Sequence, residues 1–111
     1  MSALPYDPGW LRHRVTFESA VATPDEAGGA SLSWTPLVIL WAAIEPASGQ
    51  EEIVADQLSG VVTHRVTIRW REDIAGGLRV AYRGRHFRVL VAYDPDETRR
   101  YLVAKVTEET P

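Results

Sequence analysis

The sequence predicts an all-β protein, a small closed or nearly closed β-barrel of about six strands with one long loop. Several segments alternate apolar and polar residues with a period of two, which is the pattern of a strand buried on one face. Turn-forming residues separate these segments at regular intervals, and no segment has the apolar spacing of a long helix. Closure is expected because it would leave no long strand edge open to other chains.

The 111 residues are enough for one domain with one modest core. A hydrophobic fraction of 45% with 24% charged residues is typical of a folded chain and argues against disorder. The sequence has no cysteine, which excludes disulfides, thiolate metal sites and cysteine nucleophiles. Its longest apolar run, residues 37–44, is too short to cross a bilayer, and residues 1–9 do not form a secretory signal. We therefore expect a protein made in the cytoplasm, without a membrane partner.

The first half of the chain contains two predicted strands joined by a strong turn. Residues 12–18 carry apolar side chains at every second position. Residues 22–30 collect proline, aspartate and a glycine pair, which is typical of a turn. Residues 32–44 are apolar and aromatic, and they read as one strand that is interrupted near Pro36.

The second half contains four more predicted strand segments, of which residues 62–71 give the clearest period-two pattern. Residues 78–82 and 86–93 predict a hairpin across residues 83–85. Residues 101–107 predict a last strand. Together with the first half, this makes about six strands at regular spacing.

An acidic segment, residues 46–60, separates the two middle strands, and we expect it to be the long, partly ordered loop. Loops of this length inside a compact domain are usually functional. Its candidate functional residues are polar side chains and a glycine: Ser48, Gly49, Gln50, Glu51, Glu52, Asp56 and Gln57. The barrel domain is expected to span residues 11–108, and residues 1–10 to be a flexible, proline-rich lead-in.

No motif of a phosphate-binding loop, a zinc protease or a serine hydrolase occurs. The three histidines fall on three different strands, and we expect partly buried, hydrogen-bonded rings rather than metal ligands. Asp94, Asp96 and Glu97 lack the spacing of a calcium loop and predict a turn. Glu51 and Glu52 are adjacent, so on a strand they would point to opposite sides. We predict no catalytic residue, no metal site and no cofactor, and hence no enzyme.

The net charge of −3 is unevenly distributed. Residues 1–64 hold two arginines against eight acidic residues, whereas residues 65–100 hold nine arginines against five. A solvated dipolar surface explains this split without any partner. Subunits that stack an acidic side against a basic side explain it equally well.

Arg65, Arg69 and Arg71 form a predicted stripe on one strand, and this stripe is either a contact surface or a solvated face. Trp70 would lie on the opposite face. A nucleic-acid platform needs aromatic and basic side chains on the same face, so that bases stack while phosphates are neutralised. Nucleic-acid binding is therefore the less favoured use of the stripe.

Six short motifs follow one another along residues 11–108. They are LRHRVTF from Leu11, DxxGG from Asp25, WAxIEPxSG from Trp41, THRVTIR from Thr63, YxGRxF from Tyr82, and DPDE from Asp94 followed by RYL. Each motif is weak alone, but six in register are specific. The chain resembles the head–tail joining family of long-tailed phages, also called head-closure or stopper proteins, which has relatives in gene transfer agents.

The resemblance implies a structural protein of the virion neck, a small β-barrel with a long internal loop. Its copies would form a ring, of six or twelve subunits, between the portal adaptor and the tail terminator. The ring would retain packaged double-stranded DNA, which passes through the lumen without sequence-specific binding, and would dock the tail. From the length, acidity and position of the segment, rather than from the resemblance, we expect residues 47–60 to be the movable element that projects into the lumen. A different neck ring, such as the tail terminator, and a small nucleic-acid-binding barrel stay open as alternatives.

Overall fold

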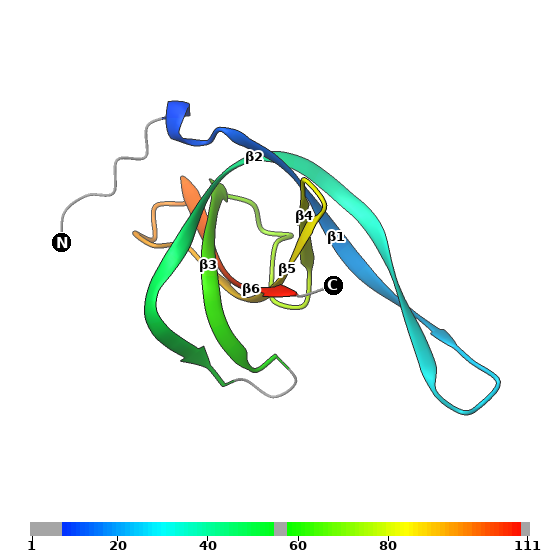
Figure 1. The fold of residues 1–111 in the computed structure, drawn as a ribbon. Coiled ribbons are helices and arrows are strands. Elements are labelled where there is room, and N and C mark those ends of the chain that lie inside the picture. The colour runs from blue at the N-terminus through cyan, green and yellow to red at the C-terminus, as the bar shows by residue number, and fades with distance from the viewer. Residues whose placement is uncertain (1–7, 55–57, 110–111) are drawn as a thin grey trace.

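The structure is a computed structural model that describes residues 8–54 and 58–109, and most of these residues belong to one antiparallel sheet (Figure 1). The elements are the 3-10 turn η1 (Pro8–Trp10) and the strands β1 (His13–Pro24), β2 (Ala30–Ile53), β3 (Gly60–Arg69), β4 (Arg79–Tyr82), β5 (Arg85–Tyr93) and β6 (Tyr101–Glu109). The sheet closes in the order β1-β2-β3-β6-β5-β4, because β4 pairs back onto β1. The predicted all-β barrel of six strands is confirmed. In the described part of the chain, no helix has the length and apolar character of a membrane span.

The barrel interior is filled by the apolar side chains that alternate along the strands. Its largest fully buried side chains are Phe17 from β1 and Phe87 from β5, each with no exposed surface. Around them pack mainly β-branched residues: Val15, Val66, Ile68, Val80, Val89 and Val106. These residue types suit a pleated, half-buried surface, and they account for the core that the period-two pattern predicted.

A second, smaller cluster lies on the outside of the barrel, where the chain enters β1. Leu11, Ala43 and Tyr101 are buried there, and Trp10 packs against them. The last residues of the segment predicted as a flexible lead-in are therefore an ordered turn that covers part of the sheet. Residues 1–7 lie outside the described residues.

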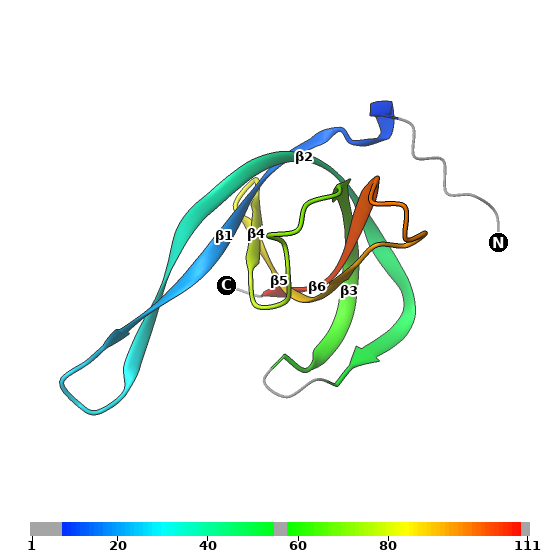
Figure 2. The same ribbon diagram turned by 180° about the vertical axis from the view of Figure 1, so that it is seen from behind.

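The first hairpin is much longer than the barrel needs, so its distal part projects from the body (Figures 1 and 2). We call residues 19–35 the arm; it gives the molecule extents of 52 × 28 × 26 Å. Its turn is stabilised by Asp25, whose Oδ1 accepts the backbone N–H groups of Ala27 at 3.0 Å and Gly29 at 2.9 Å. The interruption predicted near Pro36 is a register shift, since Phe17 pairs with Val38 but Glu18 with Pro36.

The prediction of a loop over residues 46–60 is wrong for the first half of this segment, because β2 continues to Ile53 and pairs again with β3. Residues 47–50 form a wide bulge opposite the single residue Thr63, and Gly49 adopts a positive φ of 78° there. Beyond the bulge, ladder pairing with a strong neighbouring strand overrides the low strand propensity of an acidic segment. We call residues 47–54 the β2–β3 hairpin end.

The other predicted turns are confirmed. Arg83 and Gly84, both with positive φ, join β4 to β5 as a two-residue hairpin loop. Asp94 closes the turn before β6, where its Oδ2 accepts the backbone N–H of Arg99 at 2.7 Å. The turn that follows β3 ends at Gly77, whose N–H donates to the carbonyl of Val89 at 2.9 Å.

Candidate interaction surfaces

The three arginines of the predicted stripe have three different environments in the structure. Arg65 is half-buried on β3, and Arg69 is exposed at the end of β3, with the buried Thr67 between them. Arg71 lies beyond the strand, which ends two residues earlier than predicted, and its guanidinium donates to both carboxylate oxygens of Asp73 at 2.9 and 2.8 Å. The pairing lowers the pKa of Asp73. The three arginines therefore do not form one continuous stripe.

Most of the predicted channel-loop residues gather on the β2–β3 hairpin end. Ser48, Gly49 and Gln50 are exposed in its bulge, and Glu52 is exposed beyond it. Glu51 is instead tied to the barrel by an ion pair with Lys105 of β6. The remaining two predicted loop residues, Asp56 and Gln57, lie outside the described residues.

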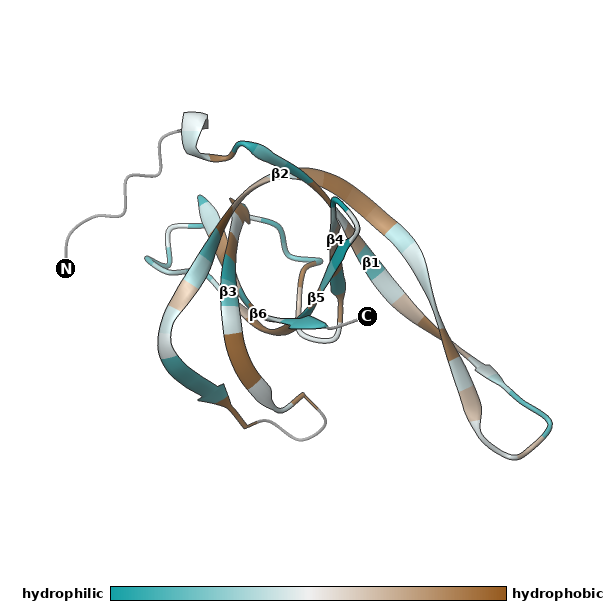
Figure 3. Ribbon diagram, in the orientation of Figure 1, coloured by the Kyte–Doolittle hydropathy of each residue, from teal (hydrophilic) through white to brown (hydrophobic). Residues whose placement is uncertain are grey.

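An exposed apolar stripe on the outer side of β2 was missed by the sequence analysis. Leu37, Ile39 and Trp41 are 43%, 55% and 57% exposed. We call these three residues the β2 stripe; Figure 3 shows an apolar stretch of β2 where the strand crosses the barrel. The signal was present in the sequence, because a run that is apolar at every position leaves one of its two faces without a partner from the core.

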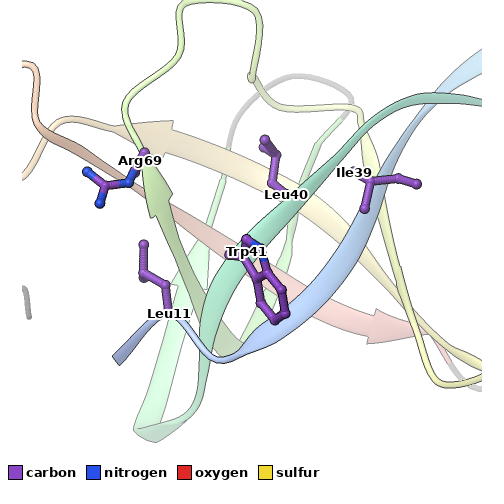
Figure 4. A pocket seen from close by; sticks show the side chains of 5 residues that line it. All are labelled: Leu11, Ile39, Leu40, Trp41 and Arg69. Atoms are coloured by element: carbon purple, nitrogen blue, oxygen red, sulfur yellow. The ribbon is translucent and has the colours of Figure 1, made fainter. Parts of the chain in front are cut away.

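A shallow pocket of about 180 Å³ opens beside this stripe (Figure 4). Its lining is apolar except for one guanidinium: Leu11, Ile39, Leu40, Trp41 and Arg69. The pairing of β2 with β3 begins only at Ala43. The preceding part of β2 therefore has β1 as its paired neighbour on one side and this pocket on the other.

The base of the arm is held against the barrel by two cation–π contacts and an ion pair. Trp34 of the arm lies under two guanidiniums, with its ring centre 4.6 Å from the Cζ of Arg79 and 4.7 Å from that of Arg88. Arg79 also donates to Glu18 at 2.7 Å, in a pair that is mostly shielded from solvent. Cation–π contacts of this kind favour a defined orientation of the arm's base.

The three histidines are partly buried, and two of them are hydrogen-bonded to a neighbouring side chain. Nδ1 of His13 is 2.7 Å from the hydroxyl of Tyr82, and Nδ1 of His64 is 2.9 Å from Oγ1 of Thr63. Burial lowers the pKa of His64 below its ordinary value. Among the residues that the structure describes, no three histidine or acidic side chains come together in a group that could hold a metal ion.

An ion pair between β5 and β6 lies beside His64. The guanidinium of Arg85 donates to both carboxylate oxygens of Glu108, at 2.8 and 2.9 Å. This pairing lowers the pKa of Glu108. Among the described residues, the acidic groups whose pKa is lowered stabilise the fold locally: Glu108 joins β6 to β5 through Arg85, and Asp73 and Asp96 are bonded within turns.

The fold and these surfaces define a class of protein: a small closed β-barrel that presents its distinctive side chains outward, on two projecting hairpins and one apolar stripe. Exposed apolar surfaces of this kind mark sites of contact with other molecules.

The sequence matches the family model described as phage head completion protein over residues 6–109, and the chain belongs to this family. It is a non-enzymatic structural protein of a phage-like particle with a role in head closure. The resemblance drawn from the six sequence motifs is thereby confirmed.

Several solved structures share the fold, among them the following two. One is a chain of the virion of a native gene transfer agent particle, with 21% identity, a TM-score of 0.67, and coverage of 90% of this chain and 96% of that one. The other is a protein of Shigella flexneri 2a solved in solution, with 24% identity, a TM-score of 0.66, and coverage of 92% and 96%. No curated protein matches the sequence.

Proposed function

We propose that the chain is the subunit of a head-closure, or stopper, ring between the portal adaptor and the tail terminator of a phage or phage-like particle. The observation that carries this proposal is the family match, which extends over residues 6–109. In this role the ring retains the packaged double-stranded DNA and offers the docking surface for the tail. It assembles in the bacterial cytoplasm and stays in the neck of the particle.

Ring formation needs two different surfaces on each copy that fit each other, because a head-to-tail interface closes on itself only in that way. The uneven charge of the chain supports such a pairing, since residues 1–64 are net acidic and residues 65–100 net basic. Contacts of this kind are weak for an isolated pair. Purified subunits are therefore expected to be mainly monomeric until an adaptor ring holds several copies together.

The β2–β3 hairpin end is the proposed channel element. It carries exposed Ser48, Gly49, Gln50 and Glu52, and Asp56 and Gln57 follow in the sequence. An acidic surface facing the lumen would not grip DNA phosphates, so the DNA could pass without binding. The four-residue bulge gives this hairpin end a point at which it can bend when the tail docks and when the DNA leaves. Arg65, Arg69 and Arg71 are proposed contact residues of the subunit's basic side.

The first experiment is the assembly of particles without this chain. Filled heads that lose their DNA and fail to join tails are expected. Heads that retain their DNA while the tails are defective would contradict the head-closure position and favour a tail-terminator ring.

The second experiment removes the bulge without disturbing the ladder. Deletion of residues 48–50 leaves Ala47 opposite Thr63, so Pro46↔His64 and Glu51↔Val62 become continuous. The variant should fold, yet its particles should leak DNA or fail to join tails. Gln50→Ala keeps the length of the bulge and is the matched control, with normal particles expected. Normal DNA retention and tail joining by the deletion variant would overturn the channel role.

A further inference from the structure

Beyond Trp34, whose ring is covered by Arg79 and Arg88 of the barrel, the arm has an apolar face without a partner from its own barrel. All of residues 20–33 are exposed. In the register of the arm, Leu32 pairs with Ala22 and Trp34 with Ala20, so these four side chains share one face. Serines and threonines dominate the other face. Leu32 is 57% exposed, and a two-stranded ribbon with one bare apolar face is the form of a segment that packs on something else.

The β2 stripe is the complementary apolar surface of the same molecule. Ile39 and Trp41 are more than half exposed, and the pocket of about 180 Å³ beside them can admit an aliphatic side chain. Figure 4 shows Ile39 and Trp41 on β2, with Arg69 across the pocket on β3. A large, exposed tryptophan beside a pocket is a typical energetic centre of a protein interface.

The charges around the two surfaces are opposite in sign. The arm's turn carries the acidic residues Asp25 and Glu26, whereas the β2 stripe is flanked by Arg14, which pairs with Trp41 across the ladder, and by Arg69. Within the described residues, Glu26, Arg14 and Arg69 make no ion pair. Opposite, unpaired charges at the rims of two apolar surfaces favour one docking orientation.

The two surfaces cannot meet within one chain. Leu32 and Ile39 lie on the same extended strand β2, seven residues apart, which separates them by roughly 23 Å at about 3.3 Å per residue. We therefore propose that the arm of one copy packs across the β2 stripe of a neighbouring copy, with Leu32 against Ile39 and Trp41, and Glu26 near Arg14 or Arg69.

The arm and the β2 stripe are different surfaces of the same chain. A contact between the arm of one copy and the β2 stripe of the next is therefore head-to-tail and can repeat around a closed ring. The inference rests on the proposed function in one respect, that copies of the chain lie side by side. It goes further in naming which side chains join them.

Cysteine cross-linking tests this contact in the purified protein, whatever the role of the chain in a particle. Because the sequence has no cysteine, Leu32→Cys and Ile39→Cys each introduce a single reactive thiol. The two variants are mixed at high concentration with a short bismaleimide. Cross-linked heterodimer is expected at several times the yield of either homodimer. Thr98→Cys, at an exposed position on another turn, replaces Ile39→Cys in the matched control.

A predominance of dimers linked between two Leu32→Cys chains would overturn the proposal in favour of symmetric arm-to-arm contact. Yields equal to the Thr98→Cys control would overturn it as well. Neither result bears on head closure, which the assembly of particles without the chain tests separately.

Charge reversal gives an independent readout in the same cross-linking assay. Glu26→Arg and Arg14→Glu, each made in both cysteine variants, should lower the heterodimer yield by about two- to fivefold, the range expected for an exposed ion pair. The doubly reversed chain should recover most of the yield. Glu26 is preferred to Asp25 because Asp25 holds the turn together. An equal loss in the double variant would contradict the pairing of Glu26 with Arg14 and leave Arg69, tested by the same exchange, as the proposed partner.

Discussion

The strands β1 and β2 contribute to both the barrel and the arm, but their side chains are buried only in the barrel. Where these strands enclose the barrel, Val15 and Phe17 are almost fully buried. A few residues further along, every side chain from residue 20 to 33 is exposed. The barrel is therefore complete by itself, whereas the arm is ordered by its ladder, by its turn and by the cation–π contacts and ion pair at its base. A period-two sequence pattern therefore predicts a strand, but it does not determine whether the same chain or another molecule covers the apolar face of that strand.

The largest effect should come from removing a side chain at the centre of the barrel. Phe87→Ala is expected to lower the free energy of unfolding by about 3–5 kcal/mol, because it deletes a fully buried ring and leaves a cavity. Urea denaturation measures this, with Phe87→Leu as a milder control. A loss below about 1 kcal/mol would mean that the barrel collapses easily and is not the rigid region of the comparison.

A smaller loss of stability is expected from an added methyl group where a loop contacts the barrel. A Cβ at Gly76 would lie 2.8 Å from the backbone oxygen of Leu90 and 2.8 Å from a methyl group of Leu58. Gly76→Ala should therefore cost about 1–3 kcal/mol of unfolding free energy through overpacking. Ala75→Ser, at the exposed neighbouring position, should be nearly neutral. Equal denaturation midpoints for the two variants would show that this loop moves to accommodate the added methyl group without loss of stability.

Acid should weaken the barrel through His64. Burial lowers the pKa of this ring in the folded state, so the unfolded state binds more protons and stability falls as the pH drops below 6.5. The lowered pKa of Glu108 acts in the same direction at more acidic pH, since its pairing with Arg85 is lost on protonation. His64→Gln should flatten the first part of this pH profile, measured as the urea midpoint. If the variant kept the wild-type pH profile, the pH dependence of stability would arise from groups other than His64.

The smallest effect on stability is expected in the arm. Leu32→Ala should change the unfolding free energy by no more than about 0.5 kcal/mol, because Leu32 has no covering partner in its own chain. Differential scanning calorimetry of the variant and the parent protein checks this at low protein concentration. A loss comparable to that of Gly76→Ala would mean that the arm packs on its own barrel and would remove the contrast between the two regions.

Most of the fold was predictable because period-two alternation determines both the strand and its buried face. The β4–β5 hairpin, the turn at Asp94 and the interruption at Pro36 also followed from local turn chemistry. The extension of β2 to Ile53 did not, because pairing with β3 is a long-range effect that the acidic composition of the segment conceals. The end of β3 at Arg69 was missed for a similar reason, since alternation continues beyond the last ladder pair.

The interaction surfaces were less predictable than the fold. The sequence indicated Arg65, Arg69 and Arg71 as one stripe, but a strand boundary and the pairing of Arg71 with Asp73 separate them. The β2 stripe was hidden inside a run that is apolar on both faces. Which of these faces the barrel covers depends on where β3 and η1 lie, and no local pattern carries that information.

The most direct test of head closure is a reconstruction of the assembled particle at a resolution that shows side chains. The account predicts a closed ring of this barrel between the head's portal assembly and the tail, with the β2–β3 hairpin ends lining the channel and each arm lying on the β2 stripe of the next copy. A ring of this chain at the end of the tail, or hairpin ends that point away from the channel, would contradict it.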